Sequence, residues 1–151
     1  MSMKRKALFP GSFDPYTIAH DAIVQRALSF TDEIIIGIGV NAEKNTTFSL
    51  ESRIDFIKRL YAKENRITVD SYDTLTLDFA RKKGVSFILR GVRNIIDFEF
   101  EKSMADFNLK ISGIETVFLI SEPQFAHVSS SLVRQLITHK QYFSHFIPEI
   151  K

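Results

Sequence analysis

The sequence contains no cysteine and no tryptophan among its 151 residues. Without cysteine, the chain can form no disulfide bond, no thiolate nucleophile and no cysteine-rich zinc or iron–sulfur site. No apolar run approaches the roughly 20 residues that a membrane-spanning helix needs. The four histidines lie at no spacing typical of zinc ligands, so we predict no metal site built from protein side chains.

An excess of one charge is also lacking, because 20 basic residues stand against 18 acidic ones, a net charge of +2. A net charge this close to zero does not indicate nucleic-acid binding. A nucleic-acid-binding module stays an alternative, because the isoelectric point of the sequence is about 8.9. Residues 1–6 are basic like the start of a signal peptide, but the apolar run that follows is short and meets Pro10 and Gly11. We expect no signal peptide, no membrane contact and a cytoplasmic protein.

Short apolar runs alternate along the chain with segments of helical periodicity. The run over residues 33–40 is apolar on both faces, which is typical of a buried parallel strand. The predicted strands cover residues 6–9, 32–40, 66–69, 85–89 and 115–120, and the predicted helices cover residues 18–30, 49–61, 75–83, 94–109 and 129–137. This order predicts an α/β fold in one domain over residues 1–151: a doubly wound, Rossmann-like, five-stranded parallel sheet with helices on both faces.

The segment from Lys6 to His20 predicts the main ligand site. A buried strand is expected to break at Pro10-Gly11, turn, and enter a helix that carries Thr17 and His20 near its first turn. Backbone N–H groups, a hydroxyl and an imidazole then face one small volume, which a phosphate chain fills well. Within the turn, we interpret Asp14 as a brace for the loop rather than as a ligand-binding group.

Polar residues also follow the other four predicted strands. Ligands of open α/β sheets bind beyond the carboxyl ends of the strands, where these residues would meet. They are Lys44 after the second strand, Thr76 after the third, Arg90 and Arg93 after the fourth, and residues 125–131 after the fifth. Together with the first loop, they predict a site for two anions.

Arg90 and Arg93 admit two interpretations. Guanidinium groups are fork-shaped donors that keep their charge, which suits a bound polyanion. The alternative is ion pairing with acidic residues of the next helix, and Arg93 lies four residues before Asp97. Glu99 and Glu101 are the other acids within reach on that helix.

The triple serine at 129–131 is likewise open to two interpretations. Free N–H groups and hydroxyls at a helix start bind phosphate. A serine is also a good N-cap without any ligand, and taken alone we interpret the run as a cap.

The segment Gly11-Ser-Phe-Asp-Pro-x-Thr-x-x-His20 resembles the T/HxGH signature of the nucleotidylyltransferase superfamily. Further matching segments narrow the resemblance to the bacterial phosphopantetheine adenylyltransferases: Lys44, Arg90–Arg93, Asp97–Glu101 and Ser129–Val133. The resemblance extends over residues 6–148, nearly the whole chain. One departure is Ala19, which stands where the motif has glycine and whose methyl group would crowd a nucleotide.

This resemblance implies that AMP is transferred from ATP to 4′-phosphopantetheine, with Mg²⁺ as cofactor. It also implies a homohexamer and feedback inhibition by coenzyme A. His20 would stabilise the transition state, with Lys44 and Arg90 completing the catalytic set. The acceptor would be held by Ser12, Lys44, Thr76 and Arg90. ATP would be held by Ser12, Phe13, His20, Gly91, Val92, Arg93, Glu101, Phe125, Ala126, His127, Val128, Ser129, Ser130 and Ser131.

Two alternatives stay open at this point. The first motif alone also fits another nucleotidylyltransferase, such as a cytidylyltransferase or a nicotinate mononucleotide adenylyltransferase. A non-catalytic nucleotide-binding module is the other alternative, and it would bind nucleotide without releasing pyrophosphate.

Overall fold

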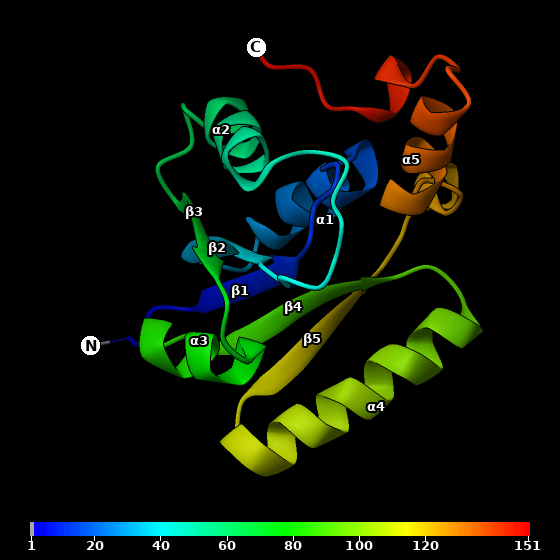
Figure 1. The fold of residues 1–151 in the computed structure, drawn as a ribbon. Coiled ribbons are helices and arrows are strands. Elements are labelled where there is room, and N and C mark those ends of the chain that lie inside the picture. The colour runs from blue at the N-terminus through cyan, green and yellow to red at the C-terminus, as the bar shows by residue number, and fades with distance from the viewer. Residues whose placement is uncertain (1) are drawn as a thin grey trace.

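The computed structural model describes residues 2–151, which form a five-stranded parallel sheet and five α-helices (Figure 1). The strands are β1 (Lys6–Gly11), β2 (Glu33–Gly39), β3 (Ile67–Tyr72), β4 (Phe87–Val92) and β5 (Glu115–Ile120). The helices are α1 (Ile18–Ala27), α2 (Leu50–Leu60), α3 (Thr76–Lys83), α4 (Ile95–Ser112) and α5 (Ser130–Thr138). Two short 3₁₀ turns cover Pro123–Phe125 and Ser144–Phe146.

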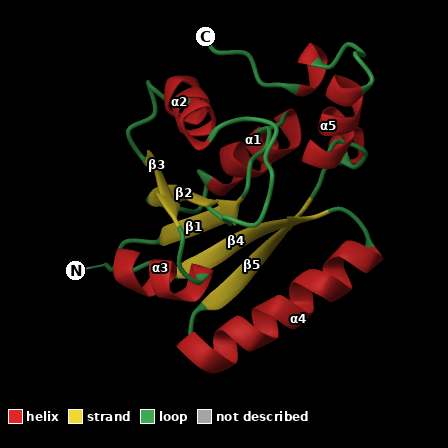
Figure 2. Ribbon diagram, viewed as in Figure 1, coloured by secondary structure: helices red, strands yellow, loops and turns green. Residues whose placement is uncertain are grey.

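The sheet has the strand order β3-β2-β1-β4-β5, and helices cover both of its faces. Figure 2 shows α1, α2 and α5 on one side of the sheet and α3 and α4 on the other. The predicted doubly wound α/β fold is confirmed. In this order β1 is the central strand and the chain reverses direction across the sheet next to it, so the loop after β1 lies at the switch point where such folds bind ligands.

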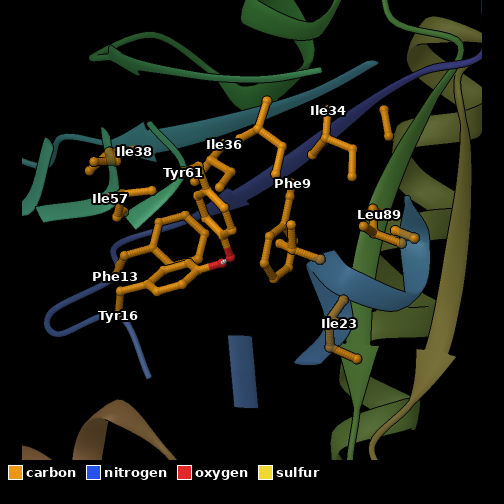
Figure 3. Close-up of a cluster of buried hydrophobic side chains, with 14 residues drawn as sticks. Phe9, Phe13, Tyr16, Ile23, Ile34, Ile36, Ile38, Ile57, Tyr61 and Leu89 are labelled. Carbon is orange, nitrogen blue, oxygen red and sulfur yellow. Dashed lines mark hydrogen bonds between the residues drawn. The ribbon is translucent and has the colours of Figure 1, made fainter. Parts of the chain in front are cut away.

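The larger part of the core lies between the sheet and the face that carries α1 and α2. Figure 3 shows its aromatic and isoleucine side chains converging, among them Phe9 from β1, Ile36 from β2 and Ile57 from α2. On the other face, Leu8 packs with Phe79 of α3. β1 therefore contributes buried side chains to both faces, as its continuous apolar run predicts.

The predicted break of the first strand at Pro10 is wrong, because β1 continues to Gly11. β1 pairs with β2 as far as Gly11, but its pairing with β4 covers only Ala7 and Leu8. Proline lacks the N–H that a ladder needs, and at Pro10 the ladder toward β4 has already ended. The Pro10 carbonyl on that side accepts from the Arg90 side chain instead, at 2.6 Å.

The other element boundaries shift by a few residues. β4 continues through residues 90–92, so Arg90 lies within the strand rather than after it. α1 ends at Ala27, three residues before the predicted end. α3 ends at Gly84 in the left-handed conformation with φ of 62°, as the glycine predicts. Within residues 2–151, no helix combines the length and the apolar character needed to cross a bilayer.

Candidate active site

Two adjoining cavities open at the carboxyl ends of the strands. The first, of about 310 Å³, is bounded by β1, its following loop, α1, β4 and the start of α5. The second, of about 300 Å³, lies between the sheet, α3 and α4. They share five lining residues, namely Pro10, Gly11, Ser12, Arg90 and Glu101. The structure thus brings two ligand-sized spaces to one common wall.

The loop of residues 11–17 is held by groups from distant parts of the chain. The buried carboxylate of Asp14 accepts hydrogen bonds from the backbone N–H groups of Thr47 and Phe48, both at 2.8 Å. Arg53 of α2 donates to the Ser12 carbonyl at 2.7 Å. The prediction that Asp14 is a structural brace is confirmed, and the brace joins the first loop to the loop that carries Lys44.

Phe13 lies in the left-handed region of backbone space, with φ of 49°. A residue with a side chain adopts this region at a cost of about 1–2 kcal/mol, so the surroundings must hold it there. They do so through its ring, which is buried, lies against Gly11, and packs on Phe9 and Tyr16 with centroids 5.3 Å apart in both cases. Strain of this kind is typical of a binding loop.

His20 is oriented by the residue that begins its helix. Thr17 caps α1, and its backbone N–H donates to Nδ1 of His20 at 2.9 Å. Because Nδ1 acts as an acceptor, the neutral ring carries its proton on Nε2. Burial, with the positive charges of Arg90 and Arg93, lowers the pKa of His20 to about 3, so the ring is neutral at ordinary pH. His20 lines the first cavity as a neutral donor.

Lys44 and Ser12 meet at the mouth of the first cavity. The Lys44 ammonium donates to the Ser12 hydroxyl at 3.2 Å, across 32 residues of sequence. Both residues line the first cavity, and Ser12 also lines the second. The sequence-based prediction that these residues lie together is confirmed.

Arg90 forms the partition between the two cavities. Its Nε and Nη2 donate to the two carboxylate oxygens of Glu101 at 2.9 and 2.6 Å, and its Nη1 donates to Pro10. Glu101 is the one buried residue of α4. The ion-pair interpretation is therefore confirmed. Arg90 also lines both cavities, and two of the five N–H groups of its guanidinium remain available to an anion.

Arg93 is also paired within the chain. Its side chain lies 3.6 Å from the Asp97 carboxylate, which also accepts from the backbone N–H of Arg93 at 3.0 Å. The Arg93 side chain lines the first cavity and is 37% exposed. An exposed pair of this type is weak, so an anionic ligand can compete for the guanidinium.

The start of α5 closes the first cavity from the opposite side. Ser129 is the N-cap and accepts from the N–H of Leu132 at 3.1 Å, as predicted for a cap. The amides of Ser130 and Ser131 precede the first backbone bond of the helix, and both residues line the cavity. Ser130 donates through its hydroxyl to Pro15 at 2.8 Å. The start of α5 therefore offers free backbone N–H groups and the positive end of the helix dipole to the cavity that His20 also lines.

Not all predicted residues line these cavities. Phe125, Ala126 and His127 lie outside both linings, and His127 packs on Phe146 instead with centroids 6.1 Å apart. Val92 is buried and lines neither. Val128 and the three serines do line the first cavity.

Thr76 lines the second cavity together with Ser12 and Arg90. Its hydroxyl shares a 2.9 Å hydrogen bond with the Tyr72 hydroxyl. Further along the same cavity, Thr116 of β5 has a buried hydroxyl with no hydrogen-bond partner among residues 2–151. Buried polar atoms without partners are rare in proteins, so Thr116 marks a place where a ligand can bond.

Several residues that hold the site together have no local signal in the sequence. Arg53 and Arg134 are the clearest cases, and Arg134 donates to the Asp14 carbonyl at 2.9 Å. Their partners lie 41 and 120 residues away in the sequence. No local pattern reports such contacts, although Arg134 lies one helical turn after the serine run that we did single out.

The arrangement suits a reaction between two anions. Cationic and N–H donors surround the first cavity, and the shared wall carries Ser12, Lys44 and Arg90. Among residues 2–151, no group of three or more histidine or carboxylate side chains lies positioned to hold a metal ion. The donors around the two cavities can position two anions and stabilise developing charge.

Comparison with known proteins identifies relatives. Residues 8–136 match the family model described as cytidylyltransferase-like. The chain is 54% identical over 145 residues to phosphopantetheine adenylyltransferase from Bacteroides thetaiotaomicron, covering 96% of each chain. It is 51% identical over 145 residues to the enzyme of the same name from Bacteroides fragilis, covering 96% of this chain and 97% of the relative.

A solved structure shows the same fold at low identity. The chain superposes on a bifunctional NMN adenylyltransferase/ADP ribose pyrophosphatase from Francisella tularensis with a TM-score of 0.73 and 15% identity. The match covers 99% of this chain and 46% of that protein. At this identity, the likeness supports the fold alone.

Proposed function

The chain belongs to the phosphopantetheine adenylyltransferases within the cytidylyltransferase-like family, and from this premise we propose how its residues divide the work. The enzyme is a nucleotidyltransferase of coenzyme A biosynthesis. It transfers AMP from ATP to 4′-phosphopantetheine and yields dephospho-coenzyme A and pyrophosphate. The residue assignments that follow are our proposal, and residues 1–151 would act as one nucleotidylyltransferase domain.

The observation that carries the assignment is the shared wall of the two cavities. ATP would occupy the first cavity, and the acceptor would occupy the second with its phosphate at Ser12, Lys44 and Arg90. The acceptor's phosphate monoester has its second pKa at about 6, so it is already largely ionised near neutral pH. No protein base is needed, and the task is to align two polyanions that repel each other.

His20 would stabilise the charge that develops on the α-phosphate. Its Nδ1 is occupied by the Thr17 N–H, so Nε2–H is the donor that faces the cavity. A donor held in a fixed position stabilises the charge that develops in the transition state of AMP transfer. Lys44 would approach the same transferring group from the acceptor side.

The leaving pyrophosphate would lie between Arg93 and the start of α5. The free amides of Ser130 and Ser131 and the positive end of the helix dipole favour such a group there. The remaining ATP contacts are proposed for Phe13, Gly91, Val92, Glu101, Phe125, Ala126, His127, Val128 and Ser129. Since Phe125, Ala126 and His127 lie outside the lining, they would contact the adenosine where it emerges from the cavity.

The acceptor's arm would run into the second cavity past Thr76. This space is lined by apolar residues such as Met104 with a few polar groups, among them Thr116 and Asn108. Such a mixture suits a chain with amides and apolar segments. Coenzyme A carries the same arm, and we propose that it inhibits the enzyme by occupying this cavity.

Mg²⁺ would accompany ATP. This ion commonly keeps several waters and binds through substrate phosphates and one or two carboxylates. The cavity fits that mode, because Asp97, beside Arg93, can supply a carboxylate oxygen, whereas Glu101 is buried and paired with Arg90. When bound, the ion would neutralise charge on the nucleotide phosphates, beside Arg93.

The outer face of α4 supports a proposal about assembly. Several apolar side chains of this helix are exposed and line neither cavity: Ile95, Ile96, Phe98, Phe107, Leu109 and Ile111. Exposed apolar patches of this extent mark interaction surfaces. We propose that further copies of the chain cover this face in a homohexamer. We also propose a cytoplasmic location, because the reaction consumes ATP.

The test is pyrophosphate release from ATP, measured with and without 4′-phosphopantetheine. We expect release only when both substrates and Mg²⁺ are present. Replacement of ATP by CTP is the control for the alternative of a cytidylyltransferase. Release from CTP at an equal rate, or nucleotide binding without release, would contradict the proposal.

A further inference from the structure

Three aromatic rings enclose the imidazole of His20. The Tyr16 ring stacks on it at 5.2 Å between centroids with an interplanar angle of 30°. Phe13 meets it edge-on at 5.0 Å, and Phe9 does so at 6.2 Å. Packing against these three rings therefore restrains the orientation of the imidazole, with Tyr16 stacked on it.

Tyr16 is in turn held by a hydrogen-bonded chain within the core. Its hydroxyl lies 2.7 Å from the hydroxyl of Tyr61, at the end of α2, and Figure 3 shows the two rings directed toward one another. The Tyr61 hydroxyl donates to Asp21 at 2.5 Å. Tyr16 is 1% exposed and Tyr61 is 7% exposed, so neither hydroxyl bonds to bulk water.

The direction of this chain follows from its last member. The Asp21 carboxylate only accepts, so the Tyr61 hydroxyl donates a hydrogen bond to it, and the Tyr16 hydroxyl must then donate to the Tyr61 oxygen. Burial raises the pKa of both tyrosine hydroxyls, so both stay protonated as this order requires. Hydrogen bonds in one direction that end on a charge strengthen one another.

The chain closes on itself around His20. Asp21 is the residue that follows His20 in α1, and Tyr16, at the other end, stacks on the His20 ring. The imidazole is thus tied to the α1 backbone in two ways. One is its own side chain, and the other runs from Asp21 through Tyr61 and Tyr16 to the stacked ring.

We propose that Tyr16, Tyr61 and Asp21 are positioning residues that hold the His20 ring at the angle from which Nε2 meets the nucleotide. The proposal rests on the role of His20 given above. The proposed role needs more than packing, because phenylalanine at positions 16 and 61 would fill the same space without the hydroxyl groups. The two hydroxyls matter only if the orientation of the Tyr16 ring matters.

The experiment compares steady-state kinetics of Tyr61→Phe, Tyr16→Phe and the double variant with the unaltered enzyme. A single hydrogen bond contributes a modest free energy, so its loss should misorient the His20 ring only part of the time. We therefore expect kcat to fall roughly three- to tenfold in Tyr61→Phe. The KM values for ATP and 4′-phosphopantetheine should stay within about twofold, since neither tyrosine lines the cavities that hold them. If the hydroxyls act in series, the double variant loses far less than the product of the two single losses.

Ile57→Val is the matched control for general loosening. Ile57 is fully buried on the same helix, α2, and contacts the same core, so the substitution lowers stability by a similar amount without touching the chain of hydroxyls. We expect an unchanged kcat for this variant at a temperature where all variants are folded.

A second readout needs no turnover. The ¹⁵N resonances of the four histidines report ring tautomer and mobility, and His20→Gln identifies the resonance of His20. We expect a single, sharp Nε2–H form in the unaltered chain and a shifted or broadened one in Tyr61→Phe, but not in Ile57→Val. This arm separates failure of the positioning idea from failure of the proposed function.

Either of two outcomes in the single variants would overturn the proposal. One is a Tyr61→Phe variant with normal kcat and an unaltered His20 resonance. The other is a kcat loss no greater than that of Ile57→Val. Losses that simply multiply in the double variant would also contradict a chain acting in series.

Discussion

The loop of residues 11–17 and helix α4 border the same two cavities but are built in opposite ways. In the loop, Asp14 and Thr17 are fully buried and their polar atoms are bonded within the chain. In α4, Glu101 is the one buried residue, and apolar side chains face outward along its length. The loop is complete within one chain, whereas α4 is completed by molecules outside it: substrate on one side and, as we propose, another copy on the other.

The largest effect should come from the loop side. His20→Ala is expected to lower kcat about 10²- to 10³-fold, because one preorganised donor to the developing charge is removed. The fold should persist, since the imidazole makes its hydrogen bonds only to its own helix cap. Pyrophosphate release measures the rate, and circular dichroism checks the fold. Near-normal turnover would contradict the role of His20 in stabilising the transition state.

Arg90 joins the two regions, and its loss should affect the acceptor more than ATP. Arg90→Ala is expected to raise the KM for 4′-phosphopantetheine roughly 10- to 100-fold, as for other charged hydrogen bonds. The substitution also leaves the buried Glu101 carboxylate without its partner, which destabilises the chain. The double variant Arg90→Ala/Glu101→Gln should recover thermal stability but not the KM. A larger change in the KM for ATP would mean that the two subsites are reversed.

On the α4 side, Phe107→Glu should disrupt self-association with little effect on the folded monomer. Phe107 is 54% exposed and lines neither cavity, so a charge there costs little in the single chain but much in a buried interface. We expect association to weaken more than tenfold, measured as molar mass by sedimentation. Lys110→Glu, an exposed site on the same helix, is the control. An unchanged molar mass for Phe107→Glu would contradict the proposal that other copies of the chain cover α4.

The depressed pKa of His20 predicts a stability change with pH. The folded-state pKa of about 3 lies below the ordinary value of 6.5, so the unfolded chain binds the proton more readily. The stability from neutral His20 is therefore complete above about pH 6.5 and is lost as the pH falls toward 3. Between pH 7 and pH 5, urea unfolding should show a loss about 1–2 kcal/mol greater for the unaltered chain than for His20→Gln. Parallel curves would mean that the imidazole is hydrated.

The smallest effect is expected deep in the second cavity. Thr116→Val removes the unpartnered hydroxyl while keeping its shape, so the free chain should become no less stable. If the hydroxyl bonds to the acceptor's arm, the KM for 4′-phosphopantetheine should rise roughly three- to tenfold with the KM for ATP unchanged. Thr116→Ser, which keeps the hydroxyl, should behave like the unaltered enzyme. Equal KM values for both variants would show that the arm does not reach β5.

The same contrast explains what could be predicted from the sequence. The sequence signals of the loop after β1 are local. They are turn-forming and capping residues within 11 positions, namely Pro10, Asp14, Thr17 and His20. The pairing of Arg93 with Asp97 was foreseen for the same reason, because helical spacing is a local rule.

Contacts between distant segments could not be predicted in this way. The strand order and the tyrosine chain depend on elements that meet only in the folded chain, with Tyr16 and Tyr61 45 residues apart. The continuation of β1 through Pro10 was missed because a proline interrupts a strand only where its missing N–H is needed. That depends on how far β4 extends alongside.

The bond from Arg90 to the Pro10 carbonyl has a consequence for how the enzyme folds. It spans 80 residues and lies where the central strand meets β4, the junction between the two halves of the sheet. Contacts of such long sequence separation carry a large loop-closure cost and are slow to form. During refolding, secondary structure should therefore return first, and the ability to turn over substrate should return only with the docking of the second half of the chain onto the first.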